Sequence, residues 1–285
     1  MNNELTVLKQ FSAIFGHSIE YSQGGGTNAS AKVGDIMIIK ASGYTLADMI
    51  EKKGYVLLSH RPIAHLYTGA VSVGEDESRA VIRQALSKDS LLQPSIETGF
   101  HSFLHKYVLH LHPLYLNALL CLKNCAPILE ELYRDSPYAL VDYKRPGHHL
   151  SAEVARQIGN SIFFLKNHGL IVSGNDADAV IETAQAICAK AKQWVIGQTG
   201  LAPYVYTAIP AEPIHKRQFL FPDAVVYLHD LKPGQSRPRN VNEALFAHNA
   251  LLEMTEKLGE RQALSDNDVQ ELIEMEEERY RKTVL

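Results

Sequence analysis

Three histidines in two apolar segments have the spacing of a metal site. His110 and His112 stand two residues apart in the segment 107–112, whose β-branched and aromatic residues are typical of a strand. Alternate residues of a strand project from the same face, so both imidazoles could reach one ion. His168 lies in a second apolar segment, 162–172, whose central glycine indicates a hairpin or tight bend. Three neutral imidazoles leave one coordination position open, which is typical of a catalytic zinc site.

A carboxylate and a hydroxyl precede the first two histidines. Residues 95–106 are predicted to form a helix, with Ser95 near its start and Glu97 in its first turn. The backbone N–H groups at such a start could bind an anion. His101 follows Glu97 by one helical turn and lies on the same face. We interpret His101 as a residue beside the ligands or as an ordinary core histidine.

Each of these signals also fits ordinary structure when it is taken singly. A lone His-x-His pair is more often two unrelated strand histidines, and the glycine cluster 24–26 could be a flexible connection. The cluster lacks the full G-x-G-x-x-G pattern, which excludes a dinucleotide-binding loop. The combination of the signals in one chain favours a single site.

Four short blocks, in this order along the chain, resemble those of the class II aldolase and adducin family of zinc-dependent sugar-phosphate aldolases. The resemblance covers residues 20–195. It is closest to the longer members, which are similar to the aldolase portion of rhamnulose-phosphate aldolase and dehydrogenase fusions. The blocks are residues 25–30, 40–43, 95–97 with His101, and 110–112 with 167–171.

The resemblance implies a metal-dependent enzyme and assigns its metal and its base. His110, His112 and His168 would bind Zn²⁺ or another divalent ion. Glu97 would move protons to and from the substrate, and in an empty site it could bind the ion directly. Another member of the family, the adducin head region, is a non-catalytic interaction module. Retention of the whole set of histidines and Glu97 disfavours that alternative here.

The resemblance also implies how the rest of a substrate is held. Asn28, Ser42, Gly43 and Ser95 would bind a phosphate group, because small residues let several backbone N–H groups approach its oxygens. A tyrosine from a neighbouring subunit acts as an acid in the family, and Tyr133 is the candidate at the corresponding place. The family relationship implies a homo-oligomer, specifically a tetramer.

The reaction expected from the resemblance is cleavage of a ketose 1-phosphate to dihydroxyacetone phosphate and a short aldehyde. The same chemistry would serve a sugar-phosphate 4-epimerase or a decarboxylase of an oxo-acid phosphate, and these alternatives stay open. The small-molecule partner is a sugar phosphate in each case.

Composition narrows the class of protein. The 285 residues are 46% hydrophobic, which supports a sizeable core, and the formal net charge is −4 with no block of consecutive basic residues. We therefore expect no nucleic-acid partner. The N-terminus lacks a basic start followed by an apolar core, and no window approaches eighteen consecutive apolar residues. The sequence predicts a cytoplasmic protein with no membrane partner.

Periodicity predicts an irregular mixture of helices and strands. Apolar spacing indicates helices, β-branched runs indicate strands, and six prolines indicate an extended segment over 197–241. The acidic run 271–278 is predicted to be a solvated helix face. The predicted helices are 5–15, 45–50, 77–86, 95–106, 114–122, 128–133, 152–158, 176–196, 242–258 and 266–282, and the predicted strands are 36–40, 107–112, 139–143 and the hairpin within 162–172.

These elements predict an α/β fold. We expect a three-layer αβα architecture with a central, largely antiparallel sheet, because no regular βαβ repeat is present. Residues 1–240 would form the class II aldolase/adducin-like domain. Residues 241–285 would form a helical extension of the same domain.

Overall fold

The computed structural model of the chain describes residues 1–69, 73–88, 90–206, 218–231 and 237–284. Within these residues seven strands form one sheet in the order β3-β2-β1-β4-β7-β6-β5, and only the pair β5 and β6 is parallel. The predicted largely antiparallel sheet is therefore confirmed. The strands are β1 Asn28–Val33, β2 Ile36–Lys40, β3 Tyr55–Ser59, β4 Tyr107–Leu111, β5 Ala139–Val141, β6 Ile162–Leu165 and β7 Gly169–Gly174.

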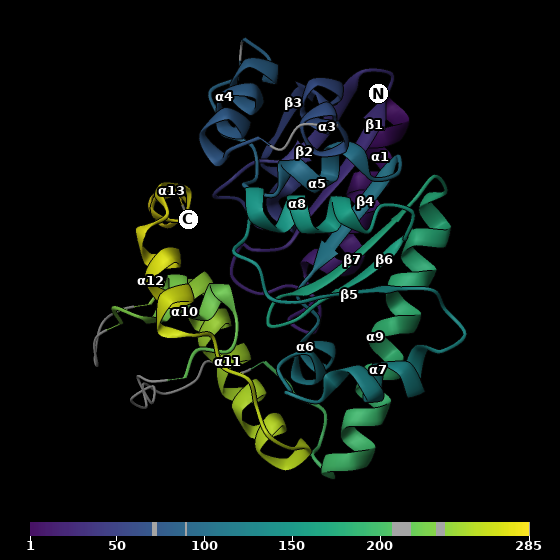
Figure 1. Cartoon of the computed structure of the whole chain (residues 1–285), viewed down its shortest axis with the longest axis vertical. Helices are drawn as coiled ribbons and strands as arrows, with labels where there is room; N and C mark the ends of the chain where they lie inside the picture. The colour runs from purple at the N-terminus through teal and green to yellow at the C-terminus, as the bar shows by residue number, and fades with distance from the viewer. Residues whose placement is uncertain (70–72, 89, 207–217, 232–236, 285) are drawn as a thin grey trace.

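Helices cover both faces of this sheet, so the three-layer prediction is also confirmed (Figure 1). The described helices are α1 Asn2–Phe11, α2 Asp48–Glu51, α3 His60–Thr68, α4 Glu75–Ala85, α5 Thr98–Phe103, α6 Leu114–Leu120, α7 Cys125–Tyr133, α8 His148–Arg156, α9 Ala177–Thr199, α10 Pro222–Leu228, α11 Arg239–Leu258, α12 Asp266–Glu274 and α13 Glu276–Val284, with a π-helical turn η1 at Ser12–Gly16. None of the described helices is both long and apolar enough to cross a bilayer.

Alternate side chains of β4 face opposite helical layers of the fold. Leu109 and Leu111 join the larger core cluster, which includes residues of α1, α6 and α9. Val108 joins the cluster made with α5 and α8, and the ring of Phe100 on α5 packs edge to face against His110. His110 therefore lies on the same sheet face as Val108, as the strand period requires.

Two predictions about the C-terminal part were wrong. The segment 197–241 was expected to be extended, but α10 lies within it and all seven of its residues are buried. Pro222 is the first residue of this helix, where proline is favoured because its missing N–H would have no partner inside the helix. Residues 207–217 and 232–236 of the same segment lie outside the described residues. The helix predicted over 266–282 is divided at Met275, whose backbone is extended (φ −60°, ψ 122°).

The C-terminal helices are packed onto the rest of the fold. α11 contacts α6 and α9, and α10 contacts α11 and α12. In Figure 1 the helices α10 to α13 gather on one side of the molecule, in green to yellow. Their buried residues, including Val225 and Leu251, belong to the larger core cluster. The boundary between a domain over 1–240 and an extension over 241–285 stays a prediction.

Candidate metal centre

The end of β4 and the turn between β6 and β7 bring the three histidines together. His110 is the last but one residue of the buried strand β4, His112 directly follows that strand, and His168 lies in the turn between β6 and β7. β4 pairs with β7 so that Leu111 lies opposite Leu170, which places the turn beside the end of β4. The predicted hairpin is confirmed by the antiparallel pair β6 and β7.

The backbone conformation at Asn167 and the close packing at Gly169 explain why an asparagine and a glycine stand at these positions of the turn. Asn167 has φ +56°, a left-handed conformation that asparagine tolerates better than most residues. A Cβ on Gly169 would lie 2.2 Å from the carbonyl oxygen of Leu111, so only glycine fits where β7 starts beside β4. The amide of Asn117 donates to the carbonyl of His168 (3.1 Å) and fixes the turn from the α6 side.

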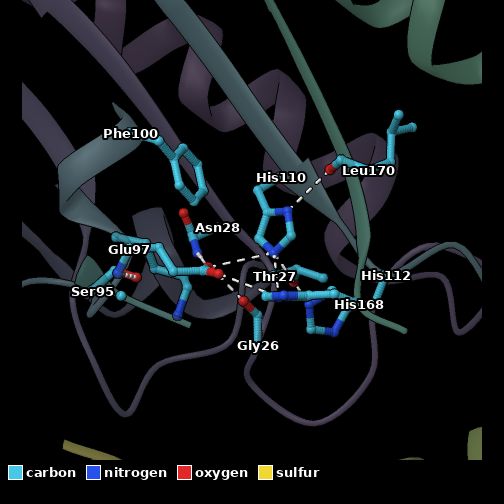
Figure 2. Close-up of polar contacts among 12 residues, drawn as sticks. Gly26, Thr27, Asn28, Ser95, Glu97, Phe100, His110, His112, His168 and Leu170 are labelled. Atoms are coloured by element: carbon cyan, nitrogen blue, oxygen red, sulfur yellow. Dashed lines mark hydrogen bonds and ion pairs between the residues drawn. The ribbon is translucent and has the colours of Figure 1, made fainter. Parts of the chain in front are cut away.

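The Nε2 atoms of the three histidines converge on one point (Figure 2). The Nε2 atom of His110 lies 3.2 Å from those of both His112 and His168. Two nitrogens bound to a tetrahedral zinc at 2.0–2.1 Å would lie about 3.3 Å apart, so the spacing fits that ion. All three side chains are buried. Neutral Nε2 lone pairs repel each other at this distance, and a cation between them would relieve that repulsion.

The tautomer of His110 is fixed by the backbone. Its Nδ1 atom lies 3.0 Å from the carbonyl oxygen of Leu170, which can only accept, so Nδ1 carries the proton and Nε2 keeps a lone pair for a metal. Burial lowers the pKa of His110 to about 3, although the charge of Glu97 opposes the shift. The ring is therefore neutral and able to ligate at physiological pH.

Glu97 is an acidic residue that contacts two members of this triad. Its Oε2 atom lies 3.4 Å from Nε2 of His110, and its Oε1 atom lies 3.2 Å from Nε2 of His168. The amide of Asn28 donates to Oε2 (2.8 Å) and holds the carboxylate (Figure 2). Burial alone would raise the pKa of Glu97, but the adjacent imidazoles of His110, His168 and His112 together bring it below its usual range. Glu97 is thus a buried anion aimed at the metal position.

The residues predicted to bind phosphate fall into two groups. Ser42 and Ser95 both line the pocket that contains His112, His168 and Glu97. They are neighbours because the N–H of Ser95 donates to the carbonyl of Lys40 at the end of β2 (3.1 Å). Gly43 adopts φ +81°, a conformation that favours glycine. Asn28 is placed differently from the others, because its amide nitrogen is directed at Glu97.

Lys40 connects this wall of the pocket to the glycine loop. It is 2% exposed, and its ammonium donates to the carbonyls of Gly25 (3.2 Å) and Tyr44 (2.6 Å). Gly25 and Lys40 also line the pocket. A buried positive charge therefore lies in the same pocket as the two serines.

Tyr133, the predicted acid, is not brought together with the histidines. Its hydroxyl donates to the carbonyl of Ile187 (2.9 Å) in the core between α7 and α9, and burial raises its pKa. The side chain is 4% exposed in the single chain, and the catalytic role of Tyr133 stays a prediction. His101 also stays outside the metal group, and its Nδ1 atom pairs with Oγ of Ser30 (2.7 Å).

Two carboxylates of the pocket were missed at the level of sequence. Asp223 on α10 has its Oδ2 atom 3.2 Å from Nδ1 of His112, and Glu278 on α13 lines the same pocket. The prediction that 271–278 is a solvated face was wrong for Glu278, which is 3% exposed. A proline followed by an acidic residue is a helix-start signal, so Pro222 and Asp223 could have indicated α10.

Comparison with known proteins agrees with this geometry. A family model described as Class II Aldolase and Adducin N-terminal domain matches residues 13–195. An uncharacterized oxidoreductase YuxG of Bacillus subtilis (strain 168) is 27% identical over 168 residues, which cover 56% of this chain and 24% of that protein. The 3-oxo-tetronate 4-phosphate decarboxylase of Haemophilus influenzae is 28% identical over 171 residues, which cover 46% of this chain and 80% of that protein. The chain thus matches about a quarter of the length of the Bacillus relative.

A solved structure shows the same fold. The N-terminal class II aldolase domain of a conserved protein from Thermoplasma acidophilum superposes with a TM-score of 0.60 at 19% identity, covering 68% of this chain and 95% of that one. The family match extends over well more than half of the 285 residues and includes the three histidines and Glu97. The chain therefore belongs to the class II aldolase and adducin family.

Proposed function

We propose that the protein is a metal-dependent lyase that cleaves a ketose 1-phosphate to dihydroxyacetone phosphate and a short aldehyde. One observation carries the proposal: three buried imidazoles and one buried carboxylate converge beside a pocket. Ser42, Ser95 and Lys40 line the same pocket. A reacting carbonyl and an anionic tail could therefore be held at the same time.

His110, His112 and His168 would hold the ion, and we propose Zn²⁺ because an all-nitrogen set with an open position suits it. When bound, zinc supplies Lewis acidity toward the carbonyl and hydroxyl oxygens of the substrate. The surrounding residues prepare the imidazoles to bind the ion. The Leu170 carbonyl keeps His110 in the ligating tautomer, and the surrounding core buries all three imidazoles.

Glu97 would move the proton. Its carboxylate is buried and ionised beside the metal position, with Asn28 fixing one of its oxygens. In the cleavage direction Glu97 would take up the proton lost by the hydroxyl that becomes the aldehyde carbonyl, and would then deliver it to the substrate carbon that loses its partner when the carbon–carbon bond breaks. In the synthetic direction the carboxylate would remove the same proton from dihydroxyacetone phosphate.

Decarboxylation of an oxo-acid phosphate is a second candidate. It is favoured by the Haemophilus relative, whose name specifies 3-oxo-tetronate 4-phosphate decarboxylase and whose length is 80% covered. Both reactions leave negative charge on a carbon next to a carbonyl, so the same site would serve either. The two differ in their products, since only decarboxylation releases carbon dioxide.

A substrate panel tests the proposal. Ketose 1-phosphates are assayed for dihydroxyacetone phosphate and 3-oxo-acid phosphates for carbon dioxide, each with and without a chelator. We expect chelator-sensitive release of dihydroxyacetone phosphate from one deoxyketose phosphate. Carbon dioxide release without any dihydroxyacetone phosphate would replace the aldolase proposal by the decarboxylase. Activity that resists complete metal removal would contradict the metal-dependent mechanism in both.

A further inference from the structure

We propose that Asp223 is a positioning residue that fixes His112 as a metal ligand. Asp223 lies on α10, beyond the end of the family match at residue 195. The C-terminal helical segment therefore contributes a side chain to the candidate metal centre from outside the region that the family model matches. The inference rests on the metal-binding part of the proposed function and does not depend on which reaction the enzyme performs.

The contact itself is short and buried. The Oδ2 atom of Asp223 lies 3.2 Å from Nδ1 of His112, and both side chains are about 1% exposed. The atoms meet the distance of an ion pair but not the geometry of a hydrogen bond. The terminal torsion of an aspartate is broad, so the carboxylate can turn toward the ring N–H at little cost.

Asp223 contacts the ring nitrogen of His112 that faces away from the other histidines. Nε2 of His112 is directed at Nε2 of His110 (3.2 Å), which leaves Nδ1 on the opposite edge of the ring. A carboxylate at that edge favours the Nδ1–H tautomer and keeps the Nε2 lone pair free for a metal. It also makes the imidazole a more basic ligand than a neutral acceptor would. His110 has such a neutral acceptor in the carbonyl of Leu170.

Gly26 shows that the packing of this pair is tight. A Cβ built on Gly26 would lie 2.3 Å from Cε1 of His112 and 2.4 Å from Oδ2 of Asp223. Any other residue would displace the pair, because real Cβ atoms do not come so close. The glycine cluster therefore has a second use besides approach to an anion: it makes room for the imidazole and its carboxylate.

The segment that carries Asp223 is anchored independently of this contact. The amide of Asn167, next to His168, donates to the carbonyl of Leu220 (2.9 Å), and the N–H of Leu264 donates to the carbonyl of Phe219 (2.8 Å). The N–H of Gly24 donates to Oε2 of Glu243 on α11 (3.0 Å). Removing the Asp223 charge should thus alter the ligand without releasing the helix.

Zinc affinity of the apo protein tests the inference without turnover. We expect Asp223→Ala to weaken Zn²⁺ binding by about 10-fold to 100-fold, the usual effect of losing a partner behind a metal-bound histidine. Asp223→Asn should lose less, because its amide oxygen can still accept from Nδ1–H. Asp230→Asn is the matched control, since its side chain is 60% exposed just after the same helix.

The outcomes separate the two proposals. Weakened binding in the Asp223 variants, with the apo melting temperature of Asp223→Asn close to the parent, supports a positioning role. Affinities of both Asp223 variants within twofold of a zinc-binding parent would overturn the inference and leave the lyase proposal standing. A parent that binds no zinc would overturn the metal-dependent function and this inference together. Should Asp223→Ala fail to fold, the near-isosteric Asp223→Asn carries the test alone.

Discussion

At the scale of single residues, Glu97 contacts two of the three histidines and two of the residues that surround them. It touches two imidazoles, is held by Asn28 and has its N–H directed at Oγ of Ser95 (3.3 Å). Such a residue could be a ligand, a base or both. Three imidazoles converge without it, so a metal would have three nitrogen ligands even if Glu97 turned toward a substrate.

Replacing Glu97 by glutamine separates the two roles. The amide keeps the size of the side chain but cannot accept a proton, so we expect the Glu97→Gln variant to lose at least about 100-fold in kcat. Its zinc content, measured by elemental analysis, should match the parent. Undiminished turnover would remove Glu97 from the mechanism, whereas loss of zinc with the fold intact would make it a required ligand.

Asn28 offers a test of how strictly the carboxylate must be placed. The Asn28→Asp variant replaces the amide donor, 2.8 Å from Oε2 of Glu97, by a second carboxylate. Two like charges at this distance repel each other, and we expect kcat to fall by at least about tenfold with zinc still bound. Asn160→Asp, a change at a partly exposed turn, is the control for the same substitution. Equal kcat in both variants would contradict the orienting role of Asn28.

The residues of the site were predictable to different degrees. His110, His112 and His168 follow from the strand period and from a hairpin glycine, which are local rules. Asp223 does not, because its partner His112 lies far away in the sequence and only packing brings them together. Asn28 was predicted as a phosphate residue, whereas its amide is directed at Glu97, since a side chain's direction depends on its register in β1.

At the scale of elements, α5 sets the position of Glu97, which is the residue directly before the helix. Gly99 on α5 packs on α8 so closely that a Cβ would lie 2.3 Å from Oγ of Ser151. That hydroxyl accepts from the N–H of Phe100 (3.1 Å) and donates to the carbonyl of Gly147 (2.8 Å). The contact between the two helices therefore includes a hydrogen-bonded serine that cannot move freely.

Two glycine-to-alanine variants should have opposite effects. Gly99→Ala would push α5 off α8, and we expect it to destabilise the fold by about 1–3 kcal/mol and to lower kcat. Gly197→Ala, at an exposed position of α9 with open space around it, should stabilise the fold by up to about 1 kcal/mol through helix propensity. Thermal unfolding of the two variants beside the parent measures both. A Gly99→Ala variant as stable as the parent would show that α5 and α8 separate without cost.

Element prediction succeeded where the hydrophobic period was regular and failed where a local signal has two meanings. The strand 36–40 and the hairpin were predicted because their runs are apolar and bounded by glycines. α10 was missed because prolines end helices in most contexts, yet Pro222 begins one. The break at Met275 has no proline or glycine to mark it, and it separates α12 from the helix that carries Glu278.

At the scale of the whole molecule, the C-terminal helices bury a histidine that matters for stability. His248 on α11 is fully buried near the rings of Phe219 and Phe221, and among the described residues neither of its ring nitrogens has a hydrogen-bond partner. Burial, with a smaller contribution from Arg261, lowers its pKa from 6.5 to about 4. The folded state therefore prefers the neutral ring.

This preference predicts a loss of stability in acid. Between pH 6.5 and about 4 the unfolded chain binds a proton at His248 that the folded chain does not, so the free energy of unfolding falls with falling pH. The full effect is about 3 kcal/mol. The His248→Leu variant should flatten that part of the melting curve against pH, whereas replacement of the exposed His17 by glutamine should not. Identical slopes for parent and His248→Leu would contradict the prediction.

Metal binding should stabilise the whole fold, because its ligands come from segments far apart in the chain that unfolding separates. His110 lies in β4, and the five elements α6, α7, β5, α8 and β6 separate it from His168, so no unfolded chain presents the three nitrogens together. Zinc at 100 times its dissociation constant should add about 2.7 kcal/mol to the free energy of unfolding. We expect a higher melting temperature with zinc than with chelator, and a much smaller difference for His168→Ala. Equal melting temperatures of the parent in zinc and in chelator would mean that the triad, despite its geometry, does not bind this ion.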